Sequence, residues 1–149
     1  MSAARTTGAH ERGSSLAEFA IVLTASLTLI MGIIDCGRAL YTYHLIANAA
    51  RLGSRYAIVR GAACTVASCP ATQTSIQTYV RGLAPELNQA SMTVTTTWST
   101  TSSCTSVPAN TAGCLVAVQV VYPFRFAAVP LLPNFAMSMT STSKMVMSQ

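Results

Sequence analysis

A long uncharged apolar run near the start of the chain limits what this sequence can fold into more than any other feature. Residues 19–34 (FAIVLTASLTLIMGII) are 16 residues without a charge, interrupted only by Ser, Thr and Gly. As a helix they would extend about 24 Å. A helix that begins at Ser14 would reach about 31 Å, close to the roughly 30 Å of a bilayer's hydrocarbon core. The run therefore predicts a transmembrane helix over residues 14–34.

The composition agrees with a membrane segment and argues against a soluble enzyme or a nucleic-acid-binding protein. Of 149 residues, 51% are hydrophobic and only 9% are charged, compared with about 25% charged in a typical soluble domain. The net charge is +5, but the basic residues form no cluster, so nucleic-acid binding is not expected. The four acidic residues and two His are too few and too scattered for a Ser-His-Asp site or paired carboxylates in the C-terminal part. We therefore expect no enzyme, no metal and no other cofactor.

One carboxylate, Glu18, lies inside the membrane-length segment. A charge at the helix centre costs about 2.5–3.5 kcal/mol on insertion scales, and less near an end, so such a residue calls for a function and a partner. Gly13 precedes it by five residues at the head of the apolar run. This spacing resembles the type IV prepilin processing site, where a membrane aspartyl peptidase cuts after the Gly. The resemblance implies cleavage between Gly13 and Ser14 and pairing of Glu18 with the new amine of a neighbouring subunit.

Two other interpretations of the segment stay open. A cleaved secretory signal peptide would explain Arg5 and Arg12 before the run, but the formal A-x-A site at residues 47–49 lies far beyond it. A plain single-pass anchor would need neither Gly13 nor Glu18. Basic residues on both sides leave the orientation undecided, whereas the cysteines favour an oxidising, extracytoplasmic location for the C-terminal part.

The residues after the run extend the resemblance to one family. The motif-bearing segments are Ala17-Glu18-Phe19-Ala20, Asp35-Cys36-Gly37-Arg38 and Ala49-Ala50-Arg51-Leu52-Gly53-Ser54-Arg55-Tyr56-Ala57. This pattern is similar to the TadE-like family, pilin-like proteins of the tight-adherence (Tad or Flp) pilus systems, and the close similarity covers about residues 12–60. Ser54 departs from the Ala that is usual in the family, and Leu52 from an acidic residue that is common there.

The resemblance assigns roles to three groups of residues. Gly13 and Ser14 would form the processing site, and Glu18 with Phe19 would act in assembly through the N-terminal amine. The motif residues on the helix are Asp35, Gly37, Arg38, Arg51, Gly53, Arg55 and Tyr56.

The function implied by the resemblance is that of a minor pilin or pseudopilin, a structural subunit acting in tight-adherence pilus assembly and hence in surface adhesion or colonisation. Its partners would be a prepilin peptidase, other pilin-like subunits, the pilus assembly platform and the lipid bilayer. It would be a single-pass protein of the bacterial inner membrane with a cytoplasmic N-terminus and an extracytoplasmic C-terminal domain. Incorporation into a surface pilus stays open. The alternative is a membrane-tethered binding module, an adhesin or envelope sensor, that uses the helix only as an anchor.

The helix is expected to continue beyond the membrane through residues 35–60. Apolar residues there recur at helical spacing and predict one stripe that packs on a globular head: Leu45, Ala49, Leu52, Tyr56 and Val59. Asp35 and Arg38 are three residues apart and can form an ion pair. Arg51 and Arg55 lie on another face, which is either solvated or in contact with a partner or with lipid phosphates.

Residues 61–149 are expected to form a small α+β outer domain. A short amphipathic helix is predicted from Pro70, at its first position, to Gly82. Alternating or β-branched residues predict three antiparallel strands, the middle one buried on both faces: residues 91–99, 115–122 and 137–147. The predicted fold is therefore type IV pilin-like, with a cleaved leader (1–13), a transmembrane helix (14–34), its extracytoplasmic extension (35–60) and the outer domain.

Four cysteines of the outer domain predict disulfides. They allow three connectivities, of which we favour the two local ones, Cys64 with Cys69 and Cys104 with Cys114; each would stabilise the domain by about 2–3 kcal/mol. A zinc site is the alternative, but the spacing fits no common finger and no His is near. Cys36 is left over and is expected to pack as a small hydrophobe, with an intersubunit disulfide or lipidation as alternatives.

Overall fold

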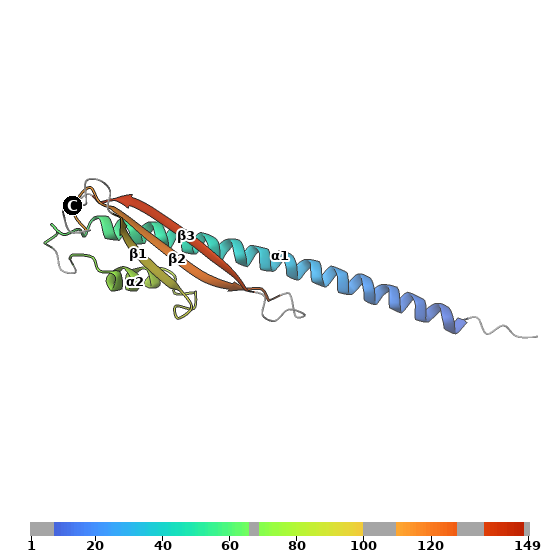
Figure 1. Ribbon diagram of the computed structural model, residues 1–149. Helices are drawn as coiled ribbons and strands as arrows, with labels where there is room; N and C mark the ends of the chain where they lie inside the picture. Colours follow the sequence, from blue (N-terminus) through green and yellow to red (C-terminus); the bar gives the residue numbers. More distant parts are fainter. Residues whose placement is uncertain (1–7, 66–68, 100–109, 128–135, 148–149) are drawn as a thin grey trace, which may run out of the picture.

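The protein has one long helix, whose N-terminal half projects away from the rest of the chain (Figure 1). Its C-terminal half packs with a short helix and a sheet, and together these form a small head. The computed structural model describes residues 8–65, 69–99, 110–127 and 136–147, and side chains from Ser14 onward. The elements, in chain order, are α1 (Gly8–Ile58), α2 (Gln73–Gly82), β1 (Thr93–Ser99), β2 (Leu115–Arg125) and β3 (Ala136–Val146). This arrangement confirms the predicted α+β, pilin-like fold class.

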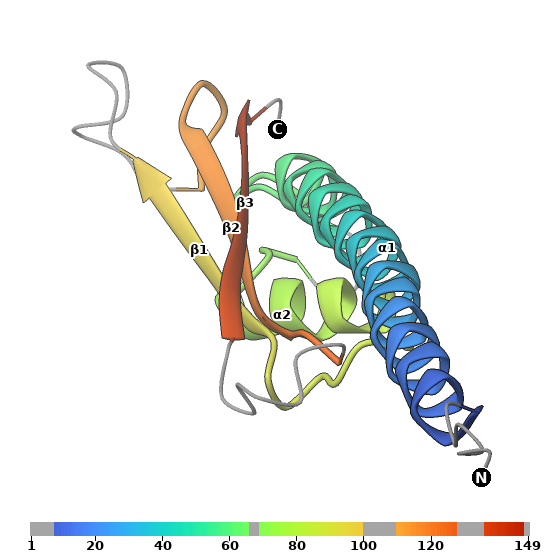
Figure 2. The same cartoon turned by 90° about the vertical axis from the view of Figure 1, so that its right-hand side faces the viewer.

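The sheet is antiparallel, with β2 in the middle and β1 and β3 on either side. Val120 of β2 lies opposite Val94 of β1 and Ser141 of β3, which fixes the register of all three strands. Both helices lie on the same face of the sheet (Figure 2). Val116, Val118 and Val120 point to this face and are fully buried, so the core of the head lies between the sheet and the two helices.

The prediction that β2 is buried on both faces is wrong. Gln119 is exposed, and Leu115 and Val121 are only half-buried on the side away from the helices. Apart from Ala117, which is buried, the described residues of the opposite face are exposed or half-buried and many are small and polar, because both helices pack on the other side. The apolar run in β2 therefore has one face that is buried under the helices and one face that is mostly half-buried.

The predicted apolar stripe of α1 is also out of phase with the side of the helix that packs. Of its members only Ala49 is buried; Leu45, Leu52 and Tyr56 are half-buried and Val59 is exposed. Apart from Ile46, the buried face consists mainly of small residues, namely Ala49, Ala50, Gly53, Ser54 and Ala57. Small side chains allow the helix to approach the sheet and α2 closely, and that contact outweighs the burial of larger apolar residues.

α2 begins three residues later than predicted. Pro70 lies before the helix, and Thr72 is the N-cap. The Thr72 hydroxyl accepts a hydrogen bond from the Ser75 backbone N–H (3.2 Å), and the Ser75 hydroxyl accepts one from the Thr72 N–H (2.9 Å). This reciprocal pair satisfies two of the N–H groups that a helix start leaves open. The predicted end at Gly82 is confirmed.

Ser54, which stands where Ala is usual in the similar family, is fully buried and bonded to the sheet. Its hydroxyl donates to the Arg51 carbonyl (2.9 Å) and therefore accepts from the Ser143 hydroxyl of β3 (2.8 Å). We expect Ser54→Ala to lower the free energy of unfolding by about 1 kcal/mol, because Ser143 loses its acceptor. The measurement is thermal unfolding followed by the fluorescence of Trp98, the single tryptophan.

The interaction is separated from general packing by a double-mutant cycle. Ser143→Ala should cost a similar amount, and the double variant should cost clearly less than the sum of the two single losses. Strict additivity would show that the two hydroxyls do not interact.

Candidate assembly surface

The N-terminal half of α1 is an exposed apolar helix. The 45 residues of α1 from Ser14 to Ile58 contain a segment that is long and apolar enough to cross a membrane. Every side chain from Ser14 to Met31 is exposed, including Phe19 at 65% and Ile21 at 70%. An apolar surface of this extent is the kind that marks a membrane or protein interaction site.

The two threonine hydroxyls within this apolar helix are satisfied by the helix itself. Thr24 donates to the carbonyl of Ala20 (2.7 Å), and Thr28 donates to the carbonyl of Thr24 (2.8 Å). A hydroxyl bonded in this way does not require water, so both threonines are compatible with a hydrocarbon environment. Glu18 is thus the one side chain of residues 14–34 that carries a full charge into the segment.

Glu18 is exposed on α1, one turn beyond Ser14. Four residues of helix separate the two by about 6 Å along the axis. Gly13 and Ser14 both lie near the start of α1. The predicted processing site, its carboxylate and Phe19 therefore lie within the first turns of one continuous helix, and the rest of the fold covers none of the three side chains described there.

Asp35 is the residue of α1 at which the segment after β2 contacts the helix. Asp35 is 97% buried, and its carboxylate accepts a hydrogen bond from the Ala127 backbone N–H (2.8 Å) and forms the predicted ion pair with Arg38 (3.0 Å). The Arg38 guanidinium also lies over the ring of Phe124, 5.7 Å from its centre. The contact with Ala127 was not predictable from local spacing, because 92 residues separate the partners.

We expect Asp35→Ala to lower the free energy of unfolding of the head by about 1.5–3 kcal/mol, the range for a hydrogen bond to a charged group. The Ala127 amide should also exchange its hydrogen faster, which amide exchange measures directly. Arg38→Ala is the matched control. This variant removes the partner of the ion pair that is about half exposed, so the loss of stability should be smaller. Equal losses for the two variants would contradict an anchoring role for the Asp35–Ala127 contact.

Two further motif residues are used inside the head. Gly53 is buried against α2 and β2. Tyr56 lies between the ring of Tyr79 on α2 (4.4 Å between centres) and the Arg60 guanidinium (3.8 Å). Stacking of this kind joins the end of α1 to α2.

The remaining motif residues are exposed. Gly37, Arg51 and Arg55 lie on the surface of α1, as Glu18 and Phe19 do. The motif residues therefore fall into one set that fixes the head on the helix and one set that faces outward, where another molecule can contact them.

A second tie between α1 and the head involves a tyrosine. The Tyr41 hydroxyl donates to Glu86 Oε2 (2.7 Å). This hydrogen bond, and then the charge of Glu86, raise the pKa of Tyr41 above its ordinary value of 10.0. The pair links α1 to the turn after α2 over 45 residues of sequence, again without a local signal that could have predicted it.

The cysteines follow the predicted pattern as far as the structure describes them. Cys64 and Cys69 form a disulfide, which confirms one predicted pair. Cys114 is disulfide-bonded, and Cys104, the partner predicted for it, lies outside the described residues. Cys36 is exposed rather than packed, so the expectation that it fills a small apolar space is wrong. Within the described ranges, no three side chains of His, Cys, Asp or Glu come together to hold a metal ion.

A membrane-length apolar helix that continues into a small head, made of an antiparallel sheet and a short helix, defines a pilin-like protein. Residues 13–55 match the family model described as TadE-like protein, which confirms the resemblance over α1 from Gly13 to Arg55. No curated protein and no solved structure matches the chain.

Proposed function

We propose that the protein is a minor pilin or pseudopilin that acts in the assembly of a tight-adherence pilus, and hence in surface adhesion or colonisation. A prepilin peptidase removes residues 1–13, residues 14–34 cross the inner membrane, and the chain from Asp35 onward lies outside the cytoplasm. The partners are the peptidase, other pilin-like subunits, the pilus assembly platform and the bilayer.

The exposure of Glu18 at the head of an otherwise uncharged apolar helix carries this proposal. A plain anchor gains nothing from a carboxylate in hydrocarbon, where it costs free energy. Cleavage after Gly13 supplies an ammonium group close to the depth of Glu18. Between neighbouring subunits, the two charges neutralise each other and set the axial position of one helix against the next.

The processing step is tested by the N-terminus of the protein extracted from membranes. We expect it to begin at Ser14, as shown by N-terminal sequencing or intact mass. Gly13→Val should retain the residues before Ser14, whereas Gly8→Val, a leader glycine outside the motif, should be cut normally. A wild-type protein that keeps the residues before Ser14 would refute processing and favour the membrane-tethered binding module instead.

A further inference from the structure

We propose that the free edge of β3 binds an extended segment of another polypeptide, and that this segment carries a carboxylate side chain near Arg51. The added segment would lengthen the sheet by one strand through backbone hydrogen bonds. The inference concerns the head alone and does not depend on whether the subunit enters a pilus.

The two edges of the sheet are treated differently. At the β1 edge, side chains of α2 occupy two of the outward backbone carbonyls: Gln77 Nε2 donates to the Val94 carbonyl (2.8 Å), and Arg81 Nη2 donates to that of Met92 (3.3 Å). Proteins commonly protect exposed strand edges in this manner, because unpaired backbone groups attract other strands. The start of the β1 edge is therefore covered by α2, and a further strand would have to displace these side chains to pair there.

The β3 edge is longer, and the described residues provide no such cover for it. The Met147 N–H donates to the Cys114 carbonyl (2.8 Å), and the Met147 carbonyl accepts from the Gly113 N–H (2.9 Å), so the backbone of Met147 faces β2. Because the direction alternates along a strand, the backbone groups of Thr140, Thr142 and Lys144 face away from β2. Among the described residues, no hydrogen bond outside the β2–β3 ladder involves these groups.

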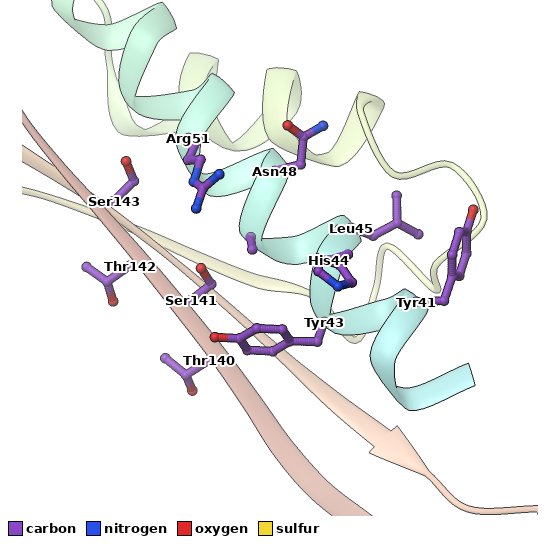
Figure 3. Close-up of a pocket in the computed structure, with 11 residues that line it drawn as sticks. Tyr41, Tyr43, His44, Leu45, Asn48, Arg51, Thr140, Ser141, Thr142 and Ser143 are labelled. Atoms are coloured by element: carbon purple, nitrogen blue, oxygen red, sulfur yellow. The ribbon is translucent and has the colours of Figure 1, made fainter. Parts of the chain in front are cut away.

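A groove of about 770 Å³ runs along this edge, between β3 and α1. Tyr43 and Arg51 reach into it from α1, with Tyr43 beside Thr140 and Ser141 of β3 (Figure 3). A smaller hollow of about 320 Å³ adjoins it and shares Tyr43 and Thr140. Its other lining residues are mainly apolar and include Leu40, Met137 and Met139. The combined groove offers an apolar end near the membrane helix and a polar end near Arg51.

Charge selects the occupant. Arg51 borders the groove, Lys144 follows on β3, and no carboxylate lines either hollow. Within the described part of the chain, Arg51 has no acidic partner, since the ion pair found there joins Arg38 to Asp35. A second copy of β3 would bring another Lys144 and no acid to the edge, and like charges across strands are unfavourable. A strand with an Asp or Glu side chain complements the site instead.

The binding test uses the full-length protein in detergent and two fluorescent synthetic peptides. Both peptides alternate Thr and Val over seven residues, and they differ only in a central Glu or Lys. Fluorescence anisotropy should show that the Glu peptide binds several-fold more tightly. Binding should also shift the NMR signals of the Thr140, Thr142 and Lys144 amides. Equal binding of the two peptides, or shifts confined to β1, would overturn the proposal.

Two pairs of variants identify the edge and the charge. Thr142→Pro removes an N–H that the β2 ladder does not use and should abolish binding, whereas Thr142→Val should keep it. Arg51→Glu should reverse the preference toward the Lys peptide, whereas Arg55→Glu, one turn further along α1 and outside the groove, should not. If Arg51→Glu and Arg55→Glu gave the same preference, the assignment of the carboxylate to Arg51 would be wrong.

A modified peptide keeps the test decisive if Thr142→Pro fails to fold. N-methylation of alternate peptide residues blocks hydrogen bonding along one side of a strand only. Of the two alternating methylation patterns on the Glu peptide, one should abolish binding and the other should preserve it. Equal effects of the two patterns would exclude strand addition.

Discussion

Glu18→Ala is expected to leave the protein in the membrane and to abolish its association with other pilin-like helices. The substitution removes an exposed charge from the apolar half of α1, which makes insertion more favourable by up to about 3 kcal/mol. It also leaves the N-terminal amine of the neighbouring subunit without a partner in a region of low dielectric constant. Breaking one side of such a buried pair costs about 3–5 kcal/mol, enough to reduce association by a factor of about one hundred to several thousand.

The loss is measured as the amount of protein that co-purifies with sheared or detergent-extracted pilus assemblies, with carbonate extraction as the check on insertion. Glu18→Gln, which keeps the size but not the charge, should behave as Glu18→Ala does. Glu86→Ala, which removes the carboxylate of the head, should assemble normally. Normal assembly of both Glu18 variants would refute the pairing and leave α1 as a simple anchor.

Gly53→Ala is expected to destabilise the head, although alanine favours helix. A Cβ at this position would lie 2.6 Å from Cγ2 of Val80 and 3.3 Å from Cγ1 of Val118, so α1 must move away from α2 and β2. Overpacking of this kind costs about 1–3 kcal/mol, and the gain in helix propensity returns at most about 1 kcal/mol. The midpoint of thermal unfolding, followed by Trp98 fluorescence, should fall.

Gly37→Ala provides the matched control in the same helix. No atom lies within 4 Å of a Cβ at Gly37, so only the propensity gain remains and the head should be as stable as before or slightly more so. Val80→Ala combined with Gly53→Ala should cost less than the sum of the single losses, because the contact that clashes has been removed. Equal stability of Gly53→Ala and Gly37→Ala would show that close packing at Gly53 does not matter.

The elements of this fold were predictable because each has a strong local pattern. The apolar run indicated the exposed half of α1, and alternation of large and small polar side chains located β1 and β3. The Asp35–Arg38 pair and the Cys64–Cys69 disulfide connect residues that are close in sequence. Local spacing was therefore sufficient for all of these features.

The errors arose where small residues or distant partners decide the structure. Hydrophobic periodicity weights Leu52 and Val59 above Gly53 and Ser54, yet the small residues are the ones buried. Hydrogen bonds from Ala127 to Asp35 and from Tyr41 to Glu86 span 92 and 45 residues and have no sequence signature. The start of α2 was misplaced because the Thr72 cap competes with Pro70 as the helix start.

The attachment of Asp35 to Ala127 also determines how the molecule responds to a pulling force. The head is bonded to α1 at Asp35 and again at Ser54, nearer the end of the helix. Two attachment points restrict rotation of the head relative to the helix. A load applied to the sheet enters the helix at two points and continues into the apolar half along one unbroken backbone (Figure 1). The head and the apolar half of α1 are therefore mechanically continuous, and a force applied to the sheet is transmitted along the helix to Glu18.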